Sequence, residues 1–191
     1  GYELLSGTQF PASATQVVLN HHQRYDGEGW PDMALATKNR RTGTQKGQDI
    51  HIFSRIVAVA NALDNLMRDA EGQRRPPIAA LHALAGEKYD KWFDPLVRRV
   101  MLRRMPPFAM GAQVKLSDGR AAAVVAPSLK QPCKPTVRLL VPEERDGALA
   151  YTTIDLLDHP KLHVAQCAGV DVRKWLYHLP DDSDVRALKV G

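Results

Sequence analysis

The first half of the chain places its apolar residues at helical spacing. The clearest case is the segment 50–67, in which apolar side chains recur at intervals of three and four residues. That spacing puts them on one face, which predicts a helix buried along this stripe. Asp49 is suited to cap the start of the helix. The stripe consists of Ile52, Ile56, Val59, Leu63 and Leu66.

Cap and proline signals delimit further helices in the same half. Ser13 can cap a helix that runs to about residue 22. Proline is tolerated in the first helical turn, so Pro76-Pro77 and Asp94-Pro95 predict two more starts. The helices expected from these signals cover residues 13–22, 76–86 and 94–105, and the prolines at 106 and 107 end the last of them.

Beyond Pro107 the period changes from helical to alternating. Val114 and Leu116 alternate with polar residues, and Asp118-Gly119 predicts a hairpin turn into a strand over 121–126. Further strands are expected over 136–141 and 149–156. We therefore expect an α+β chain with a mainly helical part (1–106), a small barrel-like β module (107–165) and a tail of uncertain structure (166–191).

Composition agrees with a folded chain. Of 191 residues, 44% are hydrophobic and 25% are charged, which is enough apolar material for a core. The net charge of +5 favours anionic partners, although a solvated basic surface explains it equally simply. The solvated explanation is also preferred for the basic residues of the 32–47 loop and the arginine doublets, namely Lys38, Arg40, Arg41, Lys46, Arg98, Arg99, Arg103 and Arg104.

The sequence carries no sign of a membrane span or a secretory signal. It has no run of 18 apolar residues, and its start lacks a charged region followed by an apolar one. The cysteines, Cys133 and Cys167, show neither disulfide nor zinc spacing. We therefore expect a cytoplasmic protein. Because the chain begins without Met, we also expect it to be part of a longer one.

The segment with the strongest chemical signal is His21-His22-Gln23-Arg24-Tyr25-Asp26-Gly27-Glu28-Gly29-Trp30-Pro31. Imidazole is a common ligand of transition metals. Adjacent helical residues point about 100° apart, so both rings can serve one site only if the helix ends there or two metals are bound. The Gly-containing run that follows supplies such an end. Taken alone, a histidine pair is more often a helix end without metal.

The order of several motifs resembles HD-GYP domains. HHxxxDGxGxP at 21–31 is similar to the family form HHExxDGxGYP, and Arg55 to Asp64 resembles its RIxxVADxxDAL helix. Arg75-Pro76 resembles the family's RPY turn, and Phe93-Asp94-Pro95 resembles its FDP helix start. The resemblance covers about residues 1–105, and the stretch 107–140 looks like a β appendage found after some members.

This resemblance implies a helical, metal-dependent phosphodiesterase that hydrolyses cyclic di-GMP to pGpG or GMP. It implies that His21 and His22 bind metal, that the remaining ligands lie upstream, and that the complete domain holds two or three divalent ions such as Fe or Mn. Position 61 corresponds to a family ligand, and Arg75 is a candidate for a phosphate contact. The loop residues Asp26, Gly27, Gly29, Trp30 and Pro31 would shape the substrate site and contact diguanylate cyclase domains. Neither membrane nor nucleic acid is expected as a partner.

Several positions depart from the family pattern. Asn61 replaces a ligating Asp, and a neutral amide binds transition metals more weakly than a carboxylate. Gln23 replaces a Glu whose charge could orient the histidines. Trp30 replaces Tyr and loses its hydroxyl. Ile78 stands where a basic residue often ends the RPY turn. The isolated chain is therefore expected to be inactive and not to hold the full set of metals.

Two predictions concern structure and rival functions. Asp26 and Arg55 are expected to form an ion pair that fixes the loop against the long helix. The rival to the phosphodiesterase is a degenerate domain, without catalysis, that binds nucleotide or protein partners. A nucleic-acid-binding β module is weaker, because the segment lacks the aromatic and basic residues of a stacking platform.

Overall fold

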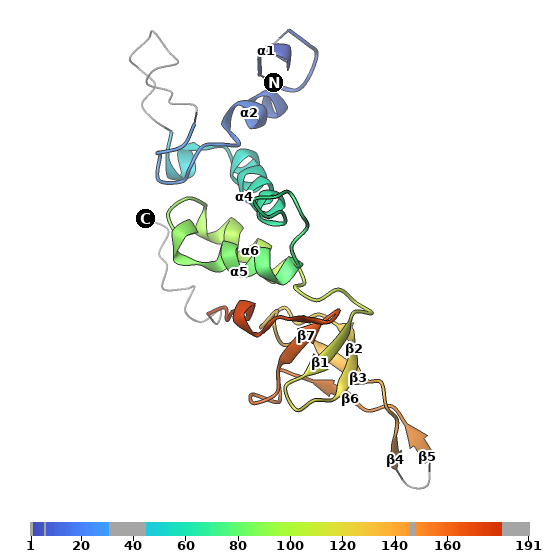
Figure 1. Cartoon of the computed structure of the whole chain (residues 1–191). Helices are drawn as coiled ribbons and strands as arrows, with labels where there is room; N and C mark the ends of the chain where they lie inside the picture. The colour runs from blue at the N-terminus through green and yellow to red at the C-terminus, as the bar shows by residue number, and fades with distance from the viewer. Residues whose placement is uncertain (1, 6, 31–44, 146–147, 181–191) are drawn as a thin grey trace. The chain divides into compact units, whose positions relative to one another are not determined.

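A computed structural model describes residues 2–5, 7–30, 45–145 and 148–180. Its contacts divide the chain into two compact units. The first contains residues 1–74 and 84–101, and the second contains residues 75–83 and 102–191. The fold class is α+β, as the sequence predicts, with helices in the first part and antiparallel sheet in the second (Figure 1). The predicted boundary after residue 106 stays a prediction.

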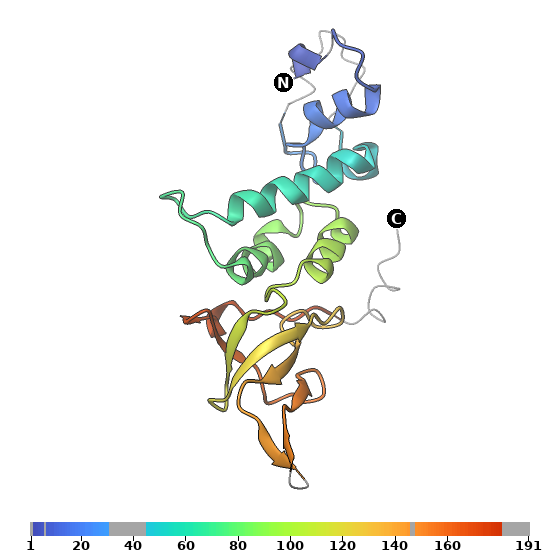
Figure 2. The same cartoon turned by 90° about the vertical axis from the view of Figure 1, so that its right-hand side faces the viewer.

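The first unit is built from helices. Its elements are α1 (Tyr2–Leu5), α2 (Ala12–Asn20), η1 (Gly47–Asp49), α4 (Ile52–Leu66) and η2 (Glu87–Tyr89), with parts of α5 (Pro77–Ala85) and α6 (Pro95–Arg104). Helix α2 lies against α4 in both views of the chain (Figures 1 and 2). A hydrogen bond of 3.5 Å from Ser54 Oγ to Gln16 O joins these two helices.

Local signals explain the helix starts, with two corrections. Asp94 caps α6 as predicted, because its Oδ1 accepts from Leu96 N at 2.8 Å and from Val97 N at 3.2 Å. Helix α4 is capped by His51, whose Nδ1 accepts from Phe53 N at 3.2 Å, and not by Asp49, which belongs to the preceding 3₁₀ turn. Ser13 lies inside α2, whose N-cap position is Pro11.

The predicted stripe of α4 is only partly buried. Val59 and Leu63 are buried in the core, at 0% and 5% exposure. The prediction is wrong for Ile52 and Ile56, which are 38% and 43% exposed. Ser54 and Ala58 are buried on the opposite face of the helix, where Ser54 contacts Gln16 of α2 and Ala58 lines a small cavity beside Gln23.

The second unit contains a six-stranded antiparallel sheet with strand order β6-β3-β2-β1-β7-β8. Its strands are β1 (Gln113–Leu116), β2 (Ala121–Ala126), β3 (Thr136–Leu139), β6 (Thr153–Asp155), β7 (Val164–Cys167) and β8 (Val170–Asp171). A separate two-stranded sheet pairs β4 (Glu143–Arg145) with β5 (Ala148–Ala150), so the expected strand over 149–156 is in fact divided between two sheets. A short 3₁₀ turn, η3 (Arg173–Trp175), follows β8.

Alternating apolar residues of the strands form the core of this unit. Val114 and Leu116 of β1 and Val137 and Leu139 of β3 are buried, while their strand neighbours are more exposed. The predicted hairpin turn between β1 and β2 is present, with Gly119 at a φ of +91° that favours glycine. The core also contains Ile78, Phe108, Ala122, Val124, Cys133, Ile154, Leu156, Val164 and Val172.

Candidate metal site at a histidine pair

The histidine pair lies where α2 ends, as the sequence predicts. Helix α2 stops at Asn20, and His21 follows as its C-cap with its N–H donated to Val17 O at 2.9 Å. The chain then turns, so the imidazole rings of His21 and His22 lie side by side with centroids 4.0 Å apart. The two rings therefore meet at this helix end although the residues are adjacent in sequence.

The hydrogen bonding of His21 suits a metal ligand. Its Nδ1 lies 3.0 Å from Val18 O, and an imidazole nitrogen facing a carbonyl carries the proton. That assignment leaves the Nε2 lone pair for a cation, as in many metal sites where the second ring nitrogen donates to a carbonyl. Burial, and then the nearby His21, lower the pKa of His22, which favours the neutral form that metals bind.

The Asp26–Trp30 loop folds back over the histidine backbone. Trp30 N donates to His22 O at 3.1 Å, and Gly27 N donates to Arg24 O at 2.9 Å. A Cβ on Gly29 would lie 2.2 Å from Arg24 N and 2.5 Å from His22 O, so only glycine fits there. The Gly of the motif is thus a close-approach residue that holds the loop against the pair. Pro31, the last motif position, lies outside the described residues.

Backbone and cation–π contacts fix the segment after the histidines to the rest of the first unit. Tyr25 N donates to Trp92 O, and Tyr25 O accepts from Gly47 N, both at 2.8 Å. The Arg24 guanidinium lies over the Trp92 ring at 4.4 Å. The loop is therefore held from two sides by residues far apart in sequence.

The predicted Asp26–Arg55 pair is wrong. Arg55 forms an ion pair with Asp94 instead, and its Nε donates to Ile50 O at 2.9 Å. Asp26 pairs with Arg24 and accepts from Glu28 N at 3.1 Å. The reason is local: Asp26 braces its own loop, whereas Asp94 is held beside Arg55 by its role as the cap of α6.

Buried polar residues flank the histidine pair in sequence. Gln23, at the family Glu position, is 3% exposed and lines a cavity of about 10 Å³ together with Arg55, Ala58 and Asp94. Asn20 is 2% exposed; its Nδ2 donates to Gln16 Oε1 at 2.9 Å, and its Oδ1 accepts no hydrogen bond in the described part of the chain. The sequence did not single out Asn20. Its only signal was its position immediately before the pair.

Asn61 lies on the helix that faces this region. It is partly buried on α4, one helical turn after Ala58, which lines the cavity beside Gln23. Arg75 is exposed and belongs to the second unit. Trp30 is 66% exposed. The roles predicted for Asn61 in metal binding, for Arg75 in phosphate binding and for the loop in substrate recognition stay predictions.

The residues present fit only part of a metal site. Within the described ranges, no three His, Cys, Asp or Glu side chains gather closely enough to hold a metal ion. The histidine pair offers two imidazoles and Asn61 a neutral amide, whereas divalent clusters in hydrolases also use carboxylates. Further ligands would have to come from residues outside this set.

Comparison with known proteins identifies the class of the chain. The HD domain family model matches residues 1–97, just over half of the chain. The chain therefore belongs to the HD domain family, whose members are phosphohydrolases and are generally metal-dependent. The match covers the histidine pair, its loop, α4 and the Phe93-Asp94-Pro95 helix start.

Two curated relatives sharpen this placement. The chain is 34% identical over 105 residues to the cyclic di-GMP phosphodiesterase response regulator RpfG of Xanthomonas campestris, covering 54% of the chain and 25% of that protein. It is 26% identical over 154 residues to the cyclic di-GMP phosphodiesterase PA4108 of Pseudomonas aeruginosa, covering 80% of the chain and 34% of that protein. The chain thus spans about a quarter to a third of these relatives. No solved structure matches it significantly.

Within the described residues, no helix has both the length and the apolar character needed to cross a bilayer.

Proposed function

We propose that this chain is part of a metal-dependent phosphodiesterase that hydrolyses cyclic di-GMP to pGpG or GMP in the cytoplasm. The observation that carries the proposal is the histidine pair at the end of α2, inside a chain of the HD domain family. The names of the two relatives support the substrate, since both are cyclic di-GMP phosphodiesterases.

In this proposal His21 and His22 are ligands through their imidazoles, and Asn61 is a weaker third donor. The metals, two or three divalent ions such as Fe or Mn, would neutralise phosphodiester charge and activate water. The residues of this chain hold the imidazoles in place. The His21 Nδ1–Val18 contact fixes one ring, and the loop that closes at Gly29 fixes the backbone of the next residue. The remaining ligands would come from residues outside the described part.

The Asp26–Pro31 loop and Arg75 have supporting roles in the proposal. The loop presents the exposed Trp30 next to His22, where an indole can contact a nucleotide base or a partner such as a diguanylate cyclase domain. Arg75 is proposed as a phosphate contact because its side chain is exposed and always charged.

A degenerate domain that binds nucleotide or protein without catalysis is the second candidate. It is favoured by the two lost carboxylates, at Gln23 and Asn61, and by the lack of a three-ligand group in the described ranges. Gln23 is buried beside Arg55 and Asp94, whose charges already pair with each other.

Turnover of cyclic di-GMP by the protein at its full natural length separates the candidates. The phosphodiesterase proposal expects turnover that His21→Ala and His22→Ala each reduce by about 100-fold or more, as loss of a metal ligand usually does. Asn61→Asp should then raise metal affinity. If the unsubstituted full-length protein does not hydrolyse cyclic di-GMP and only its Asn61→Asp variant does, the proposal is contradicted and the degenerate domain is favoured.

A further inference from the structure

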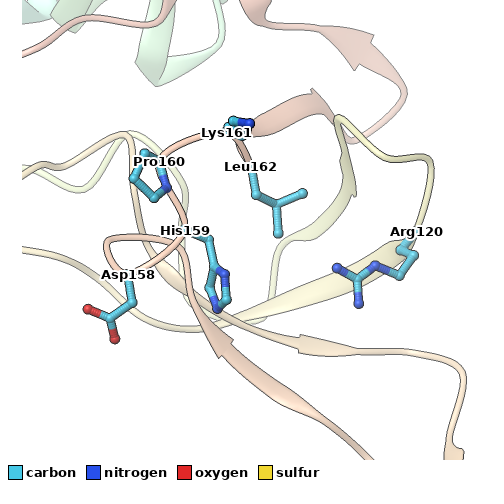
Figure 3. Close-up of a pocket in the computed structure, with 6 residues that line it drawn as sticks. All are labelled: Arg120, Asp158, His159, Pro160, Lys161 and Leu162. Carbon is cyan, nitrogen blue, oxygen red and sulfur yellow. The ribbon is translucent and has the colours of Figure 1, made fainter.

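A second, chemically distinct hollow lies on the β unit. It has a volume of about 440 Å³ and is lined by Arg120, Asp158, His159, Pro160, Lys161 and Leu162 (Figure 3). That volume falls in the usual range for small-molecule sites, about 300–1,000 Å³. All of the lining residues belong to the second unit, so the pocket is independent of the histidine pair.

One wall of the pocket is a loop with a fixed backbone. The Lys134 ammonium donates to three of its carbonyl oxygens, at His159 (3.2 Å), Pro160 (3.0 Å) and Leu162 (2.5 Å). These contacts of Lys134 hold the backbone of the loop. The side chains of His159, Pro160 and Lys161 are exposed.

The opposite wall is the β1–β2 turn. Ser117 N donates to His163 O at 2.9 Å, and His163 N donates to Ser117 Oγ at 3.2 Å, so the turn and the loop are tied together. Arg120 follows the turn, with Nη2 and Nε at 2.7 and 2.8 Å from Asp118 Oδ2. This contact orients the guanidinium, which points into the space beside the His159 ring (Figure 3).

The side chains offer two kinds of contact. Lys161 supplies a positive charge, and Arg120 supplies guanidinium N–H donors whose charge is offset by Asp118. The carboxylate of Asp158 points away from Arg120 in the close-up (Figure 3). The His159 imidazole and the Leu162 side chain provide a flat ring and an apolar surface. Phosphate is bound by such cations, and nucleobases stack on rings such as imidazole.

We propose that this pocket binds a nucleoside phosphate, with the phosphate against Arg120 and Lys161 and the base on His159. A bare anion would use only the cations, and an uncharged aromatic molecule would use only the ring and Leu162. A nucleotide is the ligand class that uses both.

The test is calorimetric titration of the 191-residue chain with 5′-GMP, guanosine and inorganic phosphate. GMP should bind more tightly than either of the other probes by about tenfold or more, which corresponds to about 1.4 kcal/mol. Equal affinity for GMP and inorganic phosphate, or no saturable binding of GMP, overturns the proposal.

Variants locate the site. Lys161→Ala and His159→Ala should each weaken GMP binding by about tenfold, whereas Lys130→Ala, an exposed loop lysine outside the pocket, should leave it unchanged. His21→Ala and His22→Ala should also leave it unchanged, which separates this site from the proposed metal site. Binding lost in the His21 or His22 variants, or lost equally in Lys130→Ala, contradicts the proposal. Because Lys161 is exposed, its variant keeps the fold, and circular dichroism checks this.

Discussion

The two units of this chain fill their interiors differently. Of the buried polar or charged residues in the described part of the chain, Asn20, Gln23, Ser54 and Asp94 lie in the first unit and Gln131 alone lies in the second. The second unit instead buries aliphatic side chains from β1, β2, β3, β6 and β7 against one another. Buried polar groups stabilise a fold only when they are paired. The stability of the first unit therefore depends on specific hydrogen-bond and ion-pair partners, and that of the second on how well its apolar side chains fill the core.

In the first unit the buried polar contacts shape the candidate site, whereas in the second unit the buried apolar side chains mainly stabilise the fold. In the first unit, polar contacts position a helix end and a loop, and part of α4 stays exposed at Ile52 and Ile56. In the second unit, core packing holds the sheet, and the proposed nucleotide pocket lies on loops at its surface. Substitutions should therefore act through lost partners in one unit and through lost volume in the other.

The largest effect is expected at the buried ion pair of the first unit. Asp94→Ala leaves Arg55 without its partner and removes the cap of α6, which should lower the free energy of unfolding by about 3–5 kcal/mol. Asp90→Ala is the control, because the Asp90 side chain is 57% exposed and its pair with Arg98 should contribute about 1 kcal/mol or less. Urea unfolding followed by tryptophan fluorescence measures both. Equal losses of unfolding free energy in the two variants would contradict the contrast between the buried and the exposed ion pair.

A volume effect of similar size is expected in the second unit. Leu116 is 1% exposed in the sheet core, so Leu116→Ala should cost about 2–5 kcal/mol of unfolding free energy. Leu149→Ala makes the same truncation at a side chain that is 75% exposed, and it should stay within about 0.5 kcal/mol of the parent. The same urea titration measures both, and a small loss for Leu116→Ala would show that this core is loosely packed.

A smaller, local effect is expected at the loop over the histidines. Gly29→Ala places a methyl group against Arg24 N and His22 O, so the loop must shift at a cost of about 1–3 kcal/mol. The NMR signals of the His21 and His22 rings should move with it. Gly7→Ala adds the same methyl where no atom lies within 4 Å, and it should leave those signals in place. Unmoved ring signals in Gly29→Ala would contradict the close approach.

The free energy of unfolding should depend on pH through the Cys133 thiol, which is buried in the second unit. Burial raises the pKa of the Cys133 thiol from its usual 9.0 to about 11. Between these two values the folded chain keeps a thiol proton that the unfolded chain loses. The stability contributed by the neutral thiol is therefore complete below pH 9.0, and it falls by about 1 kcal/mol per pH unit as the pH rises toward 11.

Cys133→Ala should flatten that slope between about pH 9 and 10, where the buried Tyr177 contributes little because free tyrosine titrates near pH 10. Urea unfolding across this range measures the slope. An unchanged slope in the variant would show that the thiol ionises equally well in the folded chain.

The smallest effect is expected on the exposed face of α4. Ile56→Ala should change the unfolding free energy by no more than about 0.5 kcal/mol, because the side chain is 43% exposed and alanine favours helix. Val59→Ala, at 0% exposure on the same helix, should cost about 1.5–3 kcal/mol. Thermal and urea unfolding compare the two, and a large loss for Ile56→Ala would mean that this face is covered.

Local signals in the sequence predicted much of the fold. The Asp94-Pro95 start of α6 and the Gly119 turn depend on a few neighbouring residues, and both are present. Strands β7 and β8 were not predicted, because Val164–Cys167 shows no alternation and pairs with a strand distant in sequence. The His51 cap was missed because histidine is not among the preferred N-cap residues. The exposure of Ile56 was missed because the helical spacing does not show which part of the stripe the rest of the fold covers.

The sequence predicted the histidine motif of the candidate site, but it did not predict the residues that hold this motif in place. The adjacency of His21 and His22 at a helix end follows from the Gly-rich run that comes next. The Arg55–Asp94 pair was not predictable, because several acidic residues were possible partners and only the fold brings positions 55 and 94 together. Asn20 gave no signal beyond its place beside the pair.

The metal content of the protein at its full natural length tests the central claim most directly. Elemental analysis of the purified parent protein should find bound divalent metal, and His21→Ala and His22→Ala should each lower it by about half or more. His82→Ala, an exposed histidine on α5, should keep the metal content of the parent. Full metal retention in both variants of the pair would contradict the assignment of these imidazoles as ligands.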